Sequence, residues 1–80
     1  MVNNVEEFKR IIGLNIEHKR KKAKMTQEKL AELLGVTVRS VYNYEKGKNL
    51  DMVLAYELSL IFDCTIDEFF LETNTTISGR

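Results

Sequence analysis

Several features that mark secreted, membrane-spanning or disulfide-rich proteins are missing from this 80-residue sequence. It has no proline and no tryptophan, and Cys64 is its one cysteine, so no disulfide can form within the chain. No apolar run approaches the ~20 residues that a transmembrane helix needs, and no signal peptide begins the chain. We therefore expect a soluble, cytoplasmic protein that has no contact with a membrane.

The patterns of catalytic and metal sites are missing as well. There is no glycine-rich phosphate loop and no nucleophile–histidine–carboxylate set with a recognisable spacing. His18, the one histidine, has neither a second histidine nor a pair of cysteines near it, so we do not expect it to bind a metal. We therefore expect neither catalysis nor a cofactor.

The charged residues balance overall but are unevenly placed. The chain has 12 Lys and Arg against 12 Asp and Glu, and this net charge of zero argues at first against a nucleic-acid partner. Residues 1–48, however, carry 11 basic against 6 acidic side chains, a net +5, whereas residues 49–80 carry 1 against 6, a net −5. This division would turn the first part of the chain toward DNA. A chance segregation of solvated charges is the alternative.

The clearest local pattern is a pair of short helices joined by a tight turn in the middle of the chain. Thr26 is a suitable N-cap for the first helix, whose leucines recur at helical intervals (Leu30, Leu33 and Leu34). Gly35 can adopt a positive φ where that helix ends. Thr37 can cap the second helix, which we expect over about 38–46, with Gly47 ending it.

The second of these helices has two different faces. At 3.6 residues per turn, Val41 and Tyr44 project to one side, with Glu45 beside them, and can pack against the first helix. The opposite side, with Val38 at its edge, carries side chains that are free to meet a partner: Arg39, Tyr42, Asn43 and Lys46. A helix that presents one polar face after a tight turn is how small proteins bring side chains into the major groove of DNA.

These residues resemble the helix-turn-helix of the XRE family, the lambda-repressor and Cro-like regulators of bacteria and phages. The matching features are Gln27 after the cap, Leu30-Ala31, Gly35-Val36 and the ending Tyr44-Glu45-Lys46-Gly47. The resemblance extends from about Gly13 to Phe70, with Ile16 and Arg20 at family positions of the first helix. It implies an all-α, five-helix lambda-repressor-like DNA-binding domain, with the helix-turn-helix at about 26–46.

On this basis the chain divides into a short N-terminal extension (1–12), the helix-turn-helix DNA-binding domain (13–71) and a polar C-terminal tail (72–80). The helical spacing of Val5, Phe8 and Ile12 predicts that the extension is either a separate turn or a prolongation of the first helix.

The ends of the other helices can be predicted from single residues. Lys24 stands where many family members have glycine, which predicts a left-handed residue there. Asp51 can cap a fourth helix. Thr65 and Glu68 form a capping-box pattern for a fifth, at the position of the family's last short helix.

The resemblance implies a transcriptional regulator, most simply a repressor, that inserts the helix 38–46 into the major groove of a palindromic operator. Arg39 is suited to paired hydrogen bonds with guanine, and a solvated surface arginine is the alternative. Asn43 is suited to pairing with adenine, and a merely exposed or phosphate-bound amide is the alternative. Thr37 and Val38 could meet a thymine methyl, but Val38 fits the core equally well. Tyr42 could reach a phosphate, a sugar or a base, or could face a protein.

Other candidates have supporting roles. By resemblance, Gln27 grips a phosphate at a helix start, and Lys46 and Lys48 are expected to supply positive charge to the DNA backbone. The expected DNA-binding set is therefore Gln27, Thr37, Val38, Arg39, Tyr42, Asn43, Lys46 and Lys48. The resemblance also implies that Arg20 and Glu45 form a structural ion pair between the first helix and the end of the recognition helix.

Two kinds of partner are expected. Double-stranded DNA is the first, bound by a homodimer that forms through the C-terminal helices, as is common in the family. The alternative is a protein-interaction module on the same fold, such as an antitoxin that neutralises a toxin partner or a domain that has lost DNA binding.

Overall fold

The computed structural model describes residues 4–71 and is entirely helical over that range. It contains four α-helices, which are α1 (Val5–Lys22), α2 (Gln27–Leu34), α3 (Val38–Glu45) and α4 (Met52–Phe62), followed by the short 3₁₀ helix η1 (Ile66–Phe69). The all-α class is therefore as predicted. The expected fifth helix is a single 3₁₀ turn, and the polar tail 72–80 lies outside the described residues.

Helix α1 settles the question of the N-terminal extension in favour of a prolonged first helix. The Asn4 side chain accepts a hydrogen bond from the Glu7 backbone N–H at 2.7 Å, which caps the helix two turns before the resemblance begins. The ring of Phe8 lies 5.6 Å from that of Phe70, measured between centroids, so the added turns pack against the end of the domain.

The other helices begin and end close to where their caps predict. Thr26 and Thr37 accept bonds from the backbone N–H three residues on, at 2.9 and 3.1 Å, and Asp51 does the same for α4 at 2.8 Å. Gly35 ends α2 with φ of 74°, and Lys24 has φ of 57° as expected. Helix α3 ends at Glu45, one residue earlier than predicted.

The last helix is short because its carbonyls are bound by another part of the chain. The Asn15 side chain in α1 donates to the carbonyl oxygens of Phe69 and Leu71, at 2.8 and 2.7 Å. These carbonyls are thereby satisfied without a further helical turn. At the other end of η1, Glu68 reaches back to accept from the Thr65 backbone N–H at 3.4 Å, as a capping box requires.

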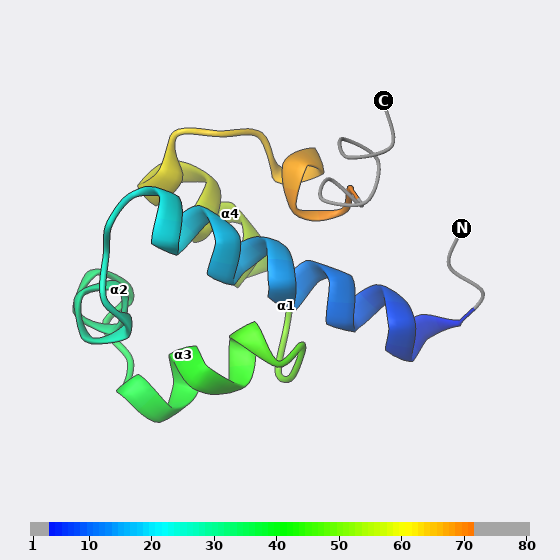
Figure 1. Ribbon diagram of the computed structural model, residues 1–80, viewed down its shortest axis with the longest axis horizontal. Coiled ribbons are helices and arrows are strands. Elements are labelled where there is room, and N and C mark those ends of the chain that lie inside the picture. Colours follow the sequence, from blue (N-terminus) through cyan, green and yellow to red (C-terminus); the bar gives the residue numbers. More distant parts are fainter. Residues whose placement is uncertain (1–3, 72–80) are drawn as a thin grey trace.

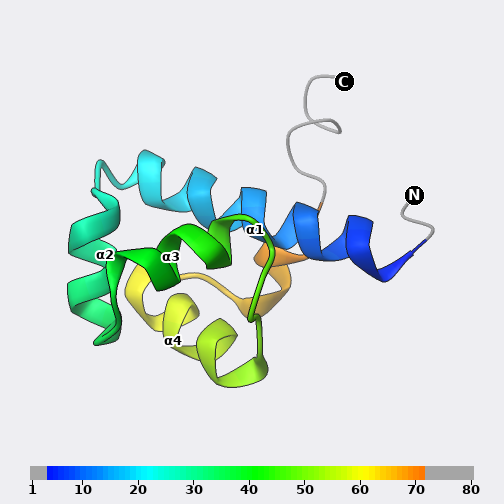
Figure 2. The ribbon, with the colours of Figure 1, turned by 90° about the horizontal axis from the view of Figure 1, so that it is seen from below.

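The core holds helix α3 in place. Its buried hydrophobic side chains come from all five elements: Ile16, Leu30, Ala31, Val41, Leu54, Leu58 and Phe69. Helix α3 packs against both α1 and α2. Figure 1 shows α3 at the lower edge of the molecule, beneath α1, and Figure 2, which views that edge, shows α3 in front, between α1 and α4. One face of α3 is therefore buried and the other points outward.

Helix α1 and the residues that follow α3 approach each other backbone to backbone. A Cβ atom on Gly13 would lie 2.6 Å from the Glu45 carbonyl oxygen, and one on Gly47 would lie 2.6 Å from the Lys9 carbonyl oxygen. Gly47 also has a φ of 84°. These two glycines allow the short distance between α1 and the end of α3. Within residues 4–71, no helix combines the length and apolarity that a membrane crossing requires.

Candidate nucleic-acid interface

Helix α3 separates its buried and exposed side chains as its periodicity predicts. Val41 is fully buried and Glu45 nearly so, whereas Arg39, Tyr42 and Lys46 are exposed. Asn43 and Tyr44 are half-buried. Val38, for which both roles were open, is 38% exposed, so it lies at the edge of the outer face and is not a core residue.

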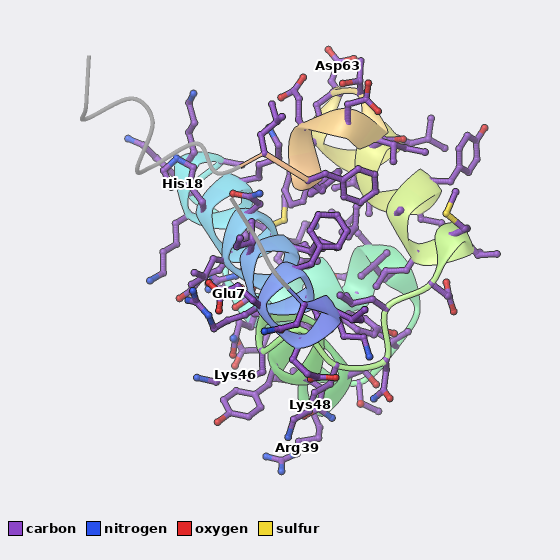
Figure 3. All side chains as sticks on the ribbon, turned by 90° about the vertical axis from the view of Figure 1, so that its right-hand side faces the viewer. Glu7, His18, Arg39, Lys46, Lys48 and Asp63 are labelled. Atoms are coloured by element: carbon purple, nitrogen blue, oxygen red, sulfur yellow. The ribbon has the colours of Figure 1, made fainter. Side chains whose placement is uncertain are left out.

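The basic side chains of this region lie together. Figure 3 shows Arg39, Lys46 and Lys48 together at the lower edge of the molecule, Asp63 at the opposite, upper edge and His18 at the upper left. Asp63 belongs to the acidic second part of the chain and His18 to the outer side of α1. The basic first part of the sequence thus places three cationic side chains at one edge of the folded molecule, beside α3.

Tyr42 lies between two of these cations. Its ring centroid is 5.1 Å from Arg39 Cζ and 5.3 Å from Lys46 Nζ. Both distances are within the ~6 Å over which an aromatic ring attracts a cation. Tyr42 itself is 41% exposed, so the ring and its cations are accessible to a partner.

The expected contact between Arg20 and Glu45 is present, and it is more extensive than a simple pair. Arg20 donates through Nε and Nη2 to the two Glu45 carboxylate oxygens, at 2.6 and 3.2 Å. It also donates through Nη1 to the Met25 carbonyl at 2.8 Å. The side chains of Arg20 and Glu45 are only 10% and 4% exposed. This pair ties α1 to the end of α3 and to the start of the loop before α2.

Gln27 joins the same network, which sequence reasoning did not foresee. Its side-chain Nε2 donates to Glu45 Oε1 at 2.9 Å. One amide hydrogen is therefore used within the protein, while the second remains available to a phosphate. Thr37 is placed in a similar way, because its hydroxyl caps α3 and lies 3.1 Å from Ser40 Oγ. The methyl group of Thr37 is the part left for an outside contact.

Two residues of α1 make close contacts that were not predicted, because Gly13 lies against the Glu45 backbone and Asn15 binds carbonyls at the end of η1. Asn15 could have been found from its place in α1, since it lies on the same helical stripe as Ile12 and Ile16. A polar residue within an apolar stripe predicts a buried, hydrogen-bonded side chain. Gly13 has no comparable signal, because the Glu45 backbone that it contacts is distant in sequence. Among residues 4–71, no group of three His, Cys, Asp or Glu side chains is placed to hold a metal ion.

Comparison with known proteins agrees with this arrangement. A family described as helix-turn-helix matches residues 16–69, from the second half of α1 to the end of η1. The chain belongs to the XRE-type helix-turn-helix family. Two relatives from Archaeoglobus fulgidus are each named an uncharacterized HTH-type transcriptional regulator. One is 36% identical over 62 residues, covering 76% of this chain and 89% of its own, and the other is 39% identical over 57 residues, covering 70% and 80%.

Because the chain belongs to the XRE-type family, α2, the turn and α3 correspond to a helix-turn-helix unit. In helix-turn-helix proteins the second helix of the unit enters the major groove, and its N-terminal residues contact the bases. Here that helix is α3, whose N-terminal turn carries Val38 and Arg39 on the exposed side. Lys46 and Lys48 follow the C-terminal end of α3 and lie at the same edge of the molecule as Arg39 (Figure 3).

Proposed function

We propose that this protein is a sequence-specific, double-stranded DNA-binding transcriptional regulator that inserts α3 into the major groove of a palindromic operator. The observation that carries the proposal is the attachment of α3. Its inner face is held by Val41 in the core and by Glu45 in the Arg20 network, which leaves Arg39, Tyr42 and Lys46 facing outward.

The exposed residues divide into those suited to bases and those suited to phosphates. Arg39 is near the N-terminus of α3 and is suited to guanine, and Asn43 lies one helical turn further on and is suited to adenine. Thr37 and Val38 offer methyl groups to thymine. Gln27, Lys46 and Lys48 contact the phosphate backbone, which gives affinity without sequence preference.

A homodimer is the simplest form in which such a protein reads a palindrome. Helix α4 carries a stripe of exposed apolar side chains, in which Val53, Tyr56 and Leu60 recur at i, i+3 and i+7, with Met52 beside them. Their exposed fractions are 68%, 57%, 63% and 70% in that order. Helix α4 contains no lysine or arginine, so this apolar stripe suits a protein surface and not DNA.

Repression is the direct consequence of operator binding, because a bound dimer excludes other proteins from the DNA that it covers. Such a protein acts in the cytoplasm, where bacterial and phage operators lie. A protein partner, as for an antitoxin, is the second candidate function, and the same exposed stripe on α4 favours it.

Selection of bound duplexes from a random DNA pool, followed by affinity measurements over a range of salt concentrations, tests the proposal. We expect a palindromic winner and a salt slope on the order of −4, from the two lysine–phosphate contacts (Lys46 and Lys48) in each of two subunits. Arg39→Ala should weaken binding to the winner by about 10- to 100-fold.

Lys21→Ala is the matched control for Arg39→Ala. Lys21 is 64% exposed and lies on α1, outside α3, where its Nζ is 2.9 Å from Glu17 Oε2. Like Arg39→Ala, the Lys21→Ala substitution removes one positive charge, so the affinity for DNA should change less than about twofold if α3 reads the DNA. Failure to enrich any duplex would refute the proposal and favour a protein partner.

A further inference from the structure

The ring of Tyr42 occupies the middle of the exposed face of α3. Arg39 precedes it by three residues and Lys46 follows it by four, the two spacings at which helical side chains lie one above another. Both cationic groups have turned toward the ring, at 5.1 and 5.3 Å from its centroid. The two residues are seven apart, so their backbones are separated by about 10 Å along the helix axis.

We propose that Tyr42 is a positioning residue, whose ring holds Arg39 and Lys46 in place before DNA is bound. The inference rests on the proposed DNA-binding function and assigns Tyr42 a part in it that differs from direct contact. Tyr42 acts on the DNA through the two cations, and its hydroxyl is not required.

The electrostatic surroundings explain why a ring is needed here. Glu45, the acidic residue of α3, is turned inward and bound by Arg20. No ion pair joins Arg39 or Lys46 to a carboxylate within residues 4–71, and Glu17 acts on Lys46 only at longer range. Without Tyr42, two long and mutually repelling side chains would have no fixed position in the free protein.

A ring also has an advantage over a carboxylate as the holding group. An ion pair uses the N–H donors of arginine and lysine, whereas attraction to the face of a ring leaves these donors unpaired. The donors of Arg39 therefore stay available for the acceptors of guanine, and those of Lys46 for a phosphate. Ordering both side chains in advance lowers the entropy lost on binding.

The proposal is tested on the duplex selected with the full-length wild-type protein. Tyr42→Phe keeps the ring and removes the hydroxyl, so affinity should stay within about twofold. Tyr42→Leu removes the ring, and we expect affinity to fall about tenfold, the equivalent of about 1.4 kcal/mol. Tyr42→Leu should also relax the preference at the same base pair that Arg39→Ala relaxes, which a merely structural defect would not do.

A double-mutant cycle separates positioning from direct contact. If the ring works through the two cations, Tyr42→Leu should cost less than about twofold once Arg39→Ala and Lys46→Ala are present. If the ring instead stacks on a base or sugar, its loss should cost the same in both backgrounds, and the proposal is wrong. A Phe variant as weak as the Leu variant would also overturn it, because the hydroxyl would then be the contact. Melting temperatures of all variants check that the fold is kept.

The arrangement can also be measured without DNA. A cation held over the ring has its neighbouring methylene protons shifted upfield, so the Arg39 δ and Lys46 ε protons should show this NMR shift in the wild type and in Tyr42→Phe, and lose it in Tyr42→Leu. Absence of the shift in the wild type overturns the positioning role. A wild type that shows the shift but selects no duplex refutes the proposed function instead, so the two failures are distinguishable.

Discussion

Arg20 connects α1 to the end of α3 through a buried ion pair with Glu45. Removing one partner of such a pair leaves the other charge unpaired, which costs about 3–5 kcal/mol. We therefore expect Arg20→Met to lower the melting temperature by at least about 12 °C, at about 4 °C or more per kcal/mol for a domain of this size. Thermal unfolding followed by circular dichroism measures this directly.

Lys21→Met is the control at the neighbouring position. Lys21 lies 2.9 Å from Glu17, and its side chain is 64% exposed. An exposed pair of this spacing contributes less than about 0.5 kcal/mol, so the melting temperature should barely change. Equal melting temperatures for the two variants would mean that the Arg20–Glu45 pair has no structural role.

Single residues show which features a sequence can predict. The caps at Thr26, Thr37 and Asp51 depend on neighbours within a few residues, and they were predicted correctly. The positive φ of Lys24 was also predicted correctly, but from the resemblance, because many family members have glycine there. The hydrogen bond from Gln27 to Glu45 spans 18 residues and depends on how α2 sits against α3, so no local pattern reveals it.

At the scale of helices, the contact between α1 and the segment after α3 depends on space that only glycine leaves. Gly47 and Gly35 both have positive φ, at 84° and 74°, so alanine is strained at either position. Only at Gly47 would the added Cβ meet backbone, 2.6 Å from the Lys9 carbonyl oxygen, because nothing lies within 4 Å of a Cβ at Gly35.

These two glycines therefore form a matched pair of variants. Gly35→Ala should cost about 1–2 kcal/mol from backbone strain alone. Gly47→Ala should cost about 1–3 kcal/mol more, because α1 or α3 must move to make room. Urea unfolding gives both values. If the two variants lost similar amounts of unfolding free energy, α1 and α3 would not be held at the distance described.

The ion pair between α1 and η1 predicts a dependence of stability on pH. Lys19 Nζ lies 2.7 Å from Glu68 Oε1, and this hydrogen bond, with a smaller contribution from the Thr65 backbone N–H, holds the pKa of Glu68 below its ordinary value. A carboxylate with a lowered pKa in the folded protein stabilises it above the unfolded pKa, and this contribution is lost as pH falls.

Stability should accordingly fall as pH drops from about 5 toward 3, and Lys19→Met should reduce this fall. Urea unfolding at several pH values measures how steeply the unfolding free energy falls with pH in the wild type and in Lys19→Met. Lys48→Met, which removes an exposed lysine at the far edge, is the control and should leave the slope unchanged (Figure 3). An unchanged slope in Lys19→Met would show that the pair does not contribute to stability.

The elements themselves were more predictable than their lengths. Helices α2, α3 and α4 have caps and apolar periodicity that agree with each other, so their positions could be predicted. The last element was expected to be a helix, yet it is one 3₁₀ turn because Asn15 takes the carbonyls of Phe69 and Leu71. Such a long-range hydrogen bond lies outside what capping patterns describe.

At the scale of the whole molecule, the basic edge beside α3 and the exposed stripe of α4 are different surfaces. The first carries Arg39, Lys46 and Lys48, and the second is apolar and free of positive charge. The division of charge along the sequence predicted the first surface. The second could not be predicted from periodicity alone, because every residue of α4 except Glu57 and Ser59 is apolar, so its outer residues look like core residues until the fold is known.

If the stripe on α4 joins two copies, a charge placed in it should separate them. Leu60 is 63% exposed, so Leu60→Glu should leave the fold intact and yield a monomer by sedimentation. In a two-fold dimer the two α3 helices bind half-sites about 34 Å apart. The monomer should therefore bind a palindrome about 100-fold more weakly, while its affinity for a single half-site stays the same.

Leu33→Glu tests whether any exposed leucine would have the same effect. Leu33 is 47% exposed on α2, outside the stripe, so this variant should remain a dimer. A wild type that is monomeric both alone and on the palindrome would refute pairing through α4. Loss of half-site binding in Leu60→Glu would show that the substitution disturbs α3 itself. Only a loss of affinity that is confined to the palindrome assigns the α4 stripe to dimer assembly.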